Sequence, residues 1–144
     1  MAHAEKTVII NRPVESVYEF LLNGTNNKLW RSSVLDIKPL SEAPYGVGSA
    51  FEQGLKGPSG RIAGDYAITD LKPNEAIQFQ VTAGPARPLG LYLLEAREAA
   101  TVVTFVLDFQ PKGLAKLTDG MIQRSMDAEV GMLDELKAFL EKHA

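Results

Sequence analysis

The stretch LAKLTDGMIQRSMDAEVGMLDELKAFLEKH, residues Leu114–His143, decides the fold because it is the longest helical pattern in the chain. Its apolar side chains recur at helical spacing and fall within one wide arc of a helical wheel. The members of this arc are Leu114, Leu117, Met121, Ile122, Ala128, Met132, Leu133, Leu136, Phe139 and Leu140. A helix with so wide an apolar stripe has to cover another layer, and the only large partner in the sequence is a sheet.

That sheet is predicted by runs of alternating apolar and polar residues that are separated by turn residues. A first strand is expected at residues 5–11, followed by a helix that begins near Pro13 and ends near Asn23. One further helical turn is expected at residues 26–30. Six strand-like runs follow, at residues 34–40, 48–56, 61–71, 76–83, 89–97 and 101–109. The short turns between consecutive runs predict an antiparallel sheet.

Glycines inside three of these runs indicate that the sheet is curved. Gly54, Gly64 and Gly90 occupy strand interiors, where glycine favours a bulge or a bend. A curved sheet that does not close tightly on the helix leaves a cavity between the two layers. We therefore expect a single α+β domain over residues 1–144, with an apolar hollow between sheet and helix that is large enough for a guest molecule.

Composition excludes several classes of function. The 144 residues carry a net charge of −3, which disfavours general nucleic-acid binding, and they include no cysteine. The two histidines, His3 and His143, lie at the chain ends, so neither a Ser-His-Asp arrangement nor a His-rich metal site is expected. No apolar run is long enough to span a bilayer, and Met1–Thr7 lacks the apolar segment of a signal peptide. The expected location is cytoplasmic, with no cofactor and no metal.

Glu129 is the most unusual residue, because it lies inside the apolar arc together with Ser125, four positions earlier. A carboxylate that points into a core is costly unless it is paired or hydrated. One interpretation pairs Glu129 with an arginine at the rim of the sheet, such as Arg61 or Arg97. The other places Ser125 and Glu129 in a partly wet cavity, where they orient the polar group of a ligand.

The chain resembles the START-like superfamily with the helix-grip fold, also called Bet v 1-like or SRPBCC, and is most similar to its polyketide cyclase/dehydrase-like branch. The resemblance covers nearly the whole chain. It is carried by INRPVESVYEF at residues 10–20, Trp30, GVG at residues 46–48, ITDLKPN at residues 68–74, the final hairpin, and the helical tail at residues 133–140. These are markers of a fold, and function does not follow from fold alone.

The resemblance implies a seven-stranded antiparallel sheet wrapped around the C-terminal helix, with two short helices after the first strand and a deep apolar pocket. Strand parity and the helical wheel then predict which residues line the pocket. These candidates for ligand binding are Trp30, Phe51, Gln53, Tyr66, Ile68, Phe79, Tyr92, Phe105, Met121, Ser125 and Glu129. For each aromatic residue, ordinary core packing is the competing interpretation.

Three functions follow from these features. The first is binding of a small hydrophobic molecule, of lipid, polyketide or aromatic type, with few polar groups to orient it. The second is a polyketide cyclase, aromatase or dehydratase that uses Glu129 or a tyrosine such as Tyr66 as acid or base. The third is a protein contact, in which Met126 and Val130 form an exposed apolar patch that could join two copies in a homodimer. Neither nucleic acid nor integral membrane association is expected.

Overall fold

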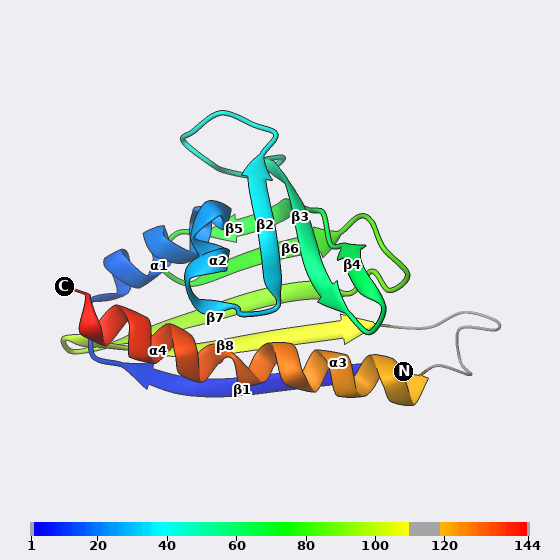
Figure 1. Cartoon of the computed structure of the whole chain (residues 1–144). Coiled ribbons are helices and arrows are strands. Elements are labelled where there is room, and N and C mark those ends of the chain that lie inside the picture. The colour runs from blue at the N-terminus through cyan, green and yellow to red at the C-terminus, as the bar shows by residue number, and fades with distance from the viewer. Residues whose placement is uncertain (1, 110–118, 144) are drawn as a thin grey trace.

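The computed structural model describes residues 2–109 and 119–143, which form a curved antiparallel sheet beside a C-terminal helical segment (Figure 1). The predicted α+β class and helix-grip architecture are confirmed. The elements are β1 (Ala2–Ile10), α1 (Val14–Leu22), η1 (Gly24–Asn26), α2 (Asn27–Trp30), β2 (Val34–Pro39), β3 (Ala50–Gly57), β4 (Gly60–Ala63), β5 (Tyr66–Lys72), β6 (Ala76–Val81), β7 (Leu89–Arg97), β8 (Ala100–Phe109), α3 (Asp119–Gly131) and α4 (Leu133–Lys142). Residues 114–118, where the long helix was expected to begin, lie outside the described residues.

The sheet follows the strand order β1-β8-β7-β6-β5-β3-β2, and every neighbouring pair is antiparallel. One predicted strand, at residues 61–71, is divided into β4 and β5, which both pair with β3. The division falls at Gly64 and Asp65. The amide of Gly64 donates to the carbonyl of Gln53 over 2.7 Å, while the Asp65 carboxylate accepts from the Gln53 amide over 3.1 Å. This side-chain contact replaces a regular ladder bond, so the sheet bends here as a bulge bends a strand.

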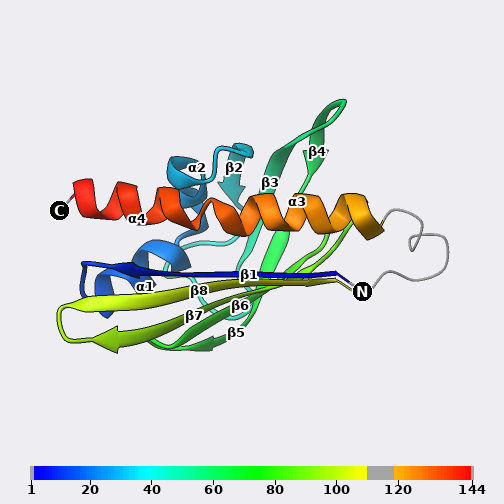
Figure 2. The same cartoon turned by 90° about the horizontal axis from the view of Figure 1, so that it is seen from below.

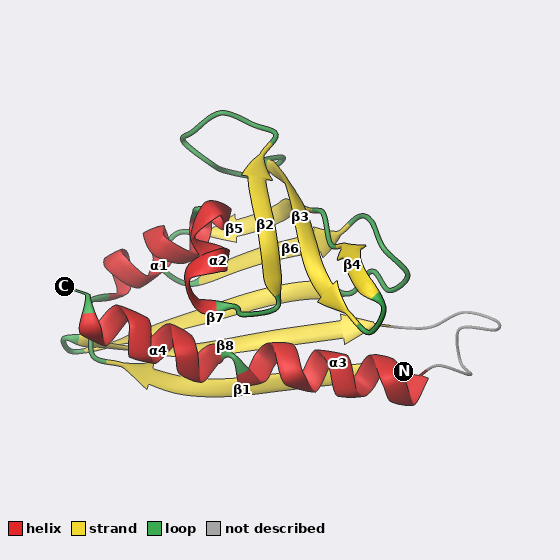
Figure 3. Ribbon diagram, viewed as in Figure 1, coloured by secondary structure: helices red, strands yellow, loops and turns green. Residues whose placement is uncertain are grey.

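The helices lie on one side of the sheet. Helices α3 and α4 follow one another in line along β1 (Figure 2), and α1 and α2 lie nearer α4 than α3 (Figure 3). The hydrophobic core lies between these helices and the inward face of the strands. None of the helices in residues 2–109 and 119–143 combines the length and apolar character needed to cross a membrane.

Polar side chains of the C-terminal helices cap the outer edge of β1, the terminal strand of the order. The side chain of Gln123 makes two hydrogen bonds with the backbone of His3. Its Oε1 accepts from the His3 N–H over 3.0 Å, and its Nε2 donates to the His3 carbonyl over 2.7 Å. Further along, Lys137 Nζ donates to the carbonyl of Ile9 over 2.5 Å. The helical segment therefore satisfies backbone groups that an edge strand otherwise leaves unpaired.

The buried stripe of the C-terminal segment differs from the prediction. Met126 and Val130 are each 4% exposed, so the expectation that they form an exposed contact patch is wrong. Met121, which was assigned to the buried arc, is 58% exposed. The helix is also interrupted at Met132, whose amide donates to the carbonyl of Glu129 over 3.1 Å. The stripe that faces the sheet consists of Met126, Val130, Leu133, Leu136 and Leu140.

Candidate functional site

A band of aromatic side chains crosses the inward face of the sheet. Alternation along the strands places Phe51 on β3, Tyr66 on β5, Phe79 on β6, Tyr92 on β7 and Phe105 on β8 on this face. Each of these residues is at most 7% exposed. Successive ring centroids are 5.2, 5.2, 5.7 and 4.7 Å apart, in tilted or stacked arrangements that favour aromatic pairing. The band thus forms a continuous apolar floor with two phenol groups in it.

Trp30, the only tryptophan in the chain, packs on this floor from α2. It is 3% exposed, and its ring lies edge-on to Tyr92 and Phe105, with centroid distances of 6.3 and 6.2 Å. Trp30 also borders a surface groove of about 660 Å³ between α2 and the C-terminal helices. The groove is lined by Lys28, Leu29, Trp30, Ser32, Ala128, Gly131, Met132, Glu135, Ala138, Phe139, Lys142 and His143. Trp30 is therefore in contact with both the groove and the aromatic band.

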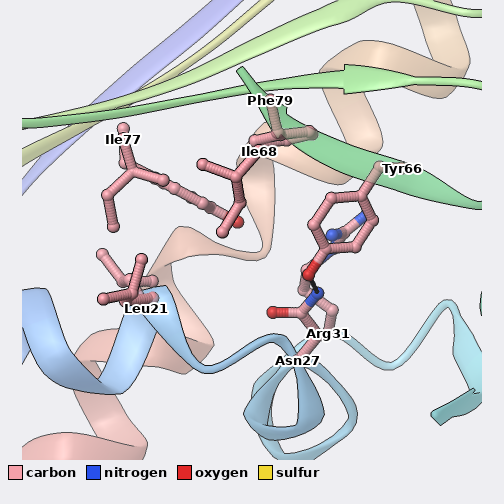
Figure 4. A pocket seen from close by; sticks show the side chains of 9 residues that line it. Leu21, Asn27, Arg31, Tyr66, Ile68, Ile77 and Phe79 are labelled. Atoms are coloured by element: carbon pink, nitrogen blue, oxygen red, sulfur yellow. Dashed lines mark hydrogen bonds between the residues drawn. The ribbon is translucent and has the colours of Figure 1, made fainter. Parts of the chain in front are cut away.

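A first group of buried polar side chains joins α2 to the sheet. The side-chain amide of Asn27 donates to Gln53 Oε1 over 3.1 Å and to the hydroxyl of Tyr66 over 3.0 Å. Figure 4 shows the phenol of Tyr66 and the amide of Asn27 pointing toward one another. Gln53 in turn donates from Nε2 to the carbonyl of Gly64 over 3.2 Å. Asn27 and Gln53 are only 3% and 2% exposed, so both lie inside the protein.

The second polar group is an ion pair between Arg31 and Glu129. Nη2 of Arg31 is 3.3 Å from Oε1 of Glu129, and the two side chains are 7% and 13% exposed. The hydroxyl of Ser33 lies 2.5 and 2.7 Å from the two carboxylate oxygens of Glu129. The guanidinium carbon of Arg31 is also 6.0 Å from the Trp30 ring and 5.9 Å from the Phe105 ring. The pair is thus held against the aromatic band and away from bulk solvent.

Sequence reasoning anticipated an arginine partner for Glu129 but named the wrong one. Arg61 instead pairs with Asp36 on the surface, where Nη2 and Oδ1 are 2.8 Å apart, and Arg97 is exposed. Arg31 itself was missed because it follows a single short helical turn, where no repeating pattern marks a buried position.

The protonation states make this region a set of hydrogen-bond donors. Burial raises the pKa of the Tyr66 phenol, and it raises the pKa of Tyr92 to about 12. Burial alone would lower the pKa of Arg31, but Glu129 together with Tyr92 and Tyr66 outweighs this effect and the pKa is raised. At neutral pH both phenols are therefore protonated and the guanidinium is charged. Within the described residues, Nε of Arg31 and Nε1 of Trp30 are buried donors without a hydrogen-bond partner.

The space left inside is small. The interior cavity has a volume of about 10 Å³, enough for one water molecule at most. It is lined by Leu21, Leu22, Asn27, Arg31, Tyr66, Ile68, Ile77, Phe79 and Tyr92. Among the residues that the structure describes, the expectation of an enclosed hollow already large enough for a guest molecule is therefore wrong. The physical reason is that Trp30 and Arg31, both from the end of α2, pack against the aromatic band.

Two predicted site residues do not face the interior. Ser125 is exposed, and Met121 is exposed as well, because the buried stripe of α3 runs through Met126 and Val130. Glu129 reaches inward from the edge of that stripe, where it contacts Arg31 and Ser33. The remaining predicted residues lie together in the interior: Trp30, Phe51, Gln53, Tyr66, Ile68, Phe79, Tyr92 and Phe105.

A curved antiparallel sheet gripping a C-terminal helix, with polar groups enclosed between them, defines a helix-grip fold. A family model described as polyketide cyclase / dehydrase and lipid transport matches residues 1–141, and the chain belongs to this family. The resemblance inferred from the sequence is thereby confirmed. No curated relative matches the sequence.

Solved structures with the same fold are distant in sequence. A protein from Thermus thermophilus has a TM-score of 0.80 at 14% identity, over 99% of both chains. A START superfamily protein from Mycobacterium smegmatis has a TM-score of 0.74 at 10% identity, over 97% of this chain and 99% of the other. The Zhui aromatase/cyclase of Streptomyces sp. R1128 has a TM-score of 0.67 at 16% identity, over 90% of this chain and 89% of the other. These likenesses concern the fold alone.

Proposed function

We propose that the protein binds a small, mainly apolar or aromatic molecule against the aromatic band, with one polar group of that molecule held beside Arg31. The observation that carries the proposal is the buried donor at Nε of Arg31, which has no acceptor among the described residues. A buried donor without a partner costs about 1–3 kcal/mol, and more when it is charged. A ligand oxygen at this position would remove that cost.

The family supports the same class of function. Its description covers polyketide cyclases, dehydrases and lipid transport, all of which handle largely apolar molecules. The neighbouring Zhui protein is named as an aromatase/cyclase. For this chain, the aromatic band and its few polar groups are the surface on which such a molecule would rest.

Binding requires that Trp30 move. The cavity of about 10 Å³ is too small for any organic ligand, whereas the adjoining groove measures about 660 Å³. Trp30 borders the groove and contacts Tyr92 and Phe105, so its ring occupies the place where the two spaces would join. Helix α2 is only four residues long. Its side-chain hydrogen bonds to the rest of the protein come from Asn27, which contacts Gln53, and from the following Arg31, which contacts Glu129. We propose that a ligand enters from the groove and replaces the Trp30 ring on the aromatic band.

The contacts favour holding a ligand over proton transfer. The Ser33 hydroxyl lies within hydrogen-bond distance of both oxygens of Glu129 and shares its one proton with them, and one oxygen also faces Arg31, so this carboxylate is engaged in structural contacts. The raised pKa of Tyr66 and Tyr92 makes each phenol a hydrogen-bond donor rather than a base at neutral pH. The cyclase alternative, with Glu129 or Tyr66 as acid or base, lacks a comparable supporting observation.

Because the chain has one tryptophan, the indole N–H gives a single NMR signal that reports on Trp30. Titration with 2-acetylnaphthalene and with 2-naphthoate should give saturable shifts of this signal and of Tyr92 and Phe105 for at least one probe. Shifts confined to groove residues such as Leu29 and Lys142, or no saturable shift with either probe, would overturn the proposed function.

A further inference from the structure

The interior site is already neutral in net charge. Arg31 is the only charged residue among the described residues that line the cavity, and its charge is balanced by Glu129 at 3.3 Å. The surrounding side chains are largely aromatic or aliphatic, with the neutral amide of Asn27 beside them. In such surroundings an additional charge without its own partner is expensive to bury.

Glu129 is also fixed in its place as the counter-charge. The Ser33 hydroxyl at 2.5 and 2.7 Å contacts both of its oxygens, and Ser33 lies next to the start of β2. A ligand that competed for Arg31 would have to break the ion pair and leave this carboxylate uncompensated. Removing one partner of a buried pair is strongly unfavourable.

Neutral acceptors meet no such obstacle. The available donors are Nε–H of Arg31 and the protonated phenols of Tyr66 and Tyr92, and the Tyr66 oxygen already accepts from Asn27. A ketone, lactone or phenol oxygen can accept from these groups without a change in net charge. A carboxylate would instead place a second anion beside a cation that already has one.

We infer that the site selects neutral, carbonyl- or hydroxyl-bearing aromatic molecules over carboxylates such as free fatty acids, and that Glu129 is the residue that sets this selectivity. The inference rests on the proposed function and names its ligand class. It assigns Glu129 the role of excluding anions, in place of a direct contact with the ligand.

Two probes of the same shape test the selectivity without any mutation: 2-acetylnaphthalene is a neutral ketone, and 2-naphthoate is an anion at pH 7.5. We expect the ketone to bind the wild-type protein at least about tenfold more tightly, by NMR titration with the Trp30 indole signal as the site-specific readout. Wild-type protein that binds naphthoate as tightly as the ketone overturns the inference and leaves the proposed function standing. Saturable binding of neither probe overturns the proposed function itself.

A variant then tests the residue. Glu129→Gln keeps the shape but removes the counter-charge, so naphthoate affinity should rise about tenfold or more while ketone affinity changes less than about threefold. The matched control is Glu95→Gln, which removes an exposed carboxylate of β7 that lines neither the cavity nor the groove and should leave both affinities unchanged. Ser33→Ala removes the hydroxyl that holds Glu129 in place and leaves the charge unchanged. It should reduce the ratio of ketone affinity to naphthoate affinity. If selectivity is the same in wild type, Glu129→Gln and Ser33→Ala, Glu129 does not set it.

Discussion

Nη2 of Arg31 lies 3.3 Å from Oε1 of Glu129, although 98 positions separate the two residues in the chain. The pair connects the end of α2 to the C-terminal turn of α3, and the two side chains are 7% and 13% exposed. It is therefore both a tie between two distant segments and the charged element of the candidate site. Its contribution to stability can be measured apart from ligand binding.

Arg31→Met should lower the free energy of unfolding by about 3 kcal/mol, because it leaves Glu129 buried without its counter-charge. The double variant Arg31→Met/Glu129→Leu should recover most of this loss, since no charge then remains unpaired. Urea denaturation followed by circular dichroism measures both. As a control, Arg61→Met breaks the exposed pair with Asp36 and should cost much less, because solvent screens that pair. An equal cost for the two single variants would contradict this account of the buried pair.

Met126→Ala should destabilise the protein by about 2–5 kcal/mol, because Met126 is 4% exposed and its removal leaves a cavity beneath α3. Met121→Ala, on the same helix, should change the stability by less than about 0.5 kcal/mol, because that side chain is 58% exposed. The midpoints of chemical denaturation of the two variants give a direct comparison. A larger loss of stability for Met121→Ala than for Met126→Ala would support the buried stripe predicted from the sequence instead.

Gly90→Ala should be destabilising by about 1–3 kcal/mol, because a methyl group there would lie 2.1 Å from Cζ of Phe79. Phe79→Leu should relieve the clash when combined with it, so that the double variant costs less than the sum of the single changes. Gly131→Ala serves as the control, since its methyl group would meet nothing within 4 Å, and it should stabilise the helix slightly. Thermal denaturation of the four proteins tests whether Phe79 packs over the bare backbone of β7.

Stability should fall steeply at alkaline pH because of the buried phenols. Burial raises the pKa of Tyr92 to about 12 in the folded protein, against about 10 in the unfolded chain. Its contribution is therefore fully present below about pH 10 and is lost as the pH rises through the folded value. Tyr92→Phe removes the ionisable group, so its free energy of unfolding should decline less between about pH 10 and pH 12 than that of the wild type. If the free energy of unfolding fell equally with pH in the two proteins, burial would not raise the pKa of Tyr92.

The strands were predictable because inward-facing apolar residues occupy every second position along them. Phe51, Phe79 and Phe105 all lie at positions that alternate with polar or less buried neighbours, and the structure places all three in the core. The division of the run at residues 61–71 was missed. It depends on the Asp65 side chain contacting the backbone of Gln53, and alternation carries no information about such a contact.

The orientation of the C-terminal helix was harder to predict, because its sequence holds more apolar residues than the sheet can cover. Met121 and Met126 have the same side chain, so hydrophobicity does not distinguish them. Which of the two is buried depends on the packing of α3 against β1. The helical wheel also assumed one continuous helix, whereas the segment is interrupted at Met132.

The candidate site was only partly predictable for a related reason. Glu129, Tyr66 and Tyr92 were recognised as polar groups in apolar patterns, but Arg31 follows a single helical turn and carries no periodic signal of its own. The volume of the cavity depends on how Trp30 and Arg31 pack, and a sequence pattern does not specify side-chain packing at that level.

The capping of β1 by Gln123 and Lys137 has a consequence for shortened forms of this protein. Without the two last helices, the backbone of the first strand would offer its amide and carbonyl groups to any extended segment nearby. A molecule cleaved before α3 would therefore present an open strand edge that a second copy could extend, and the terminal helices shield this edge in the full chain.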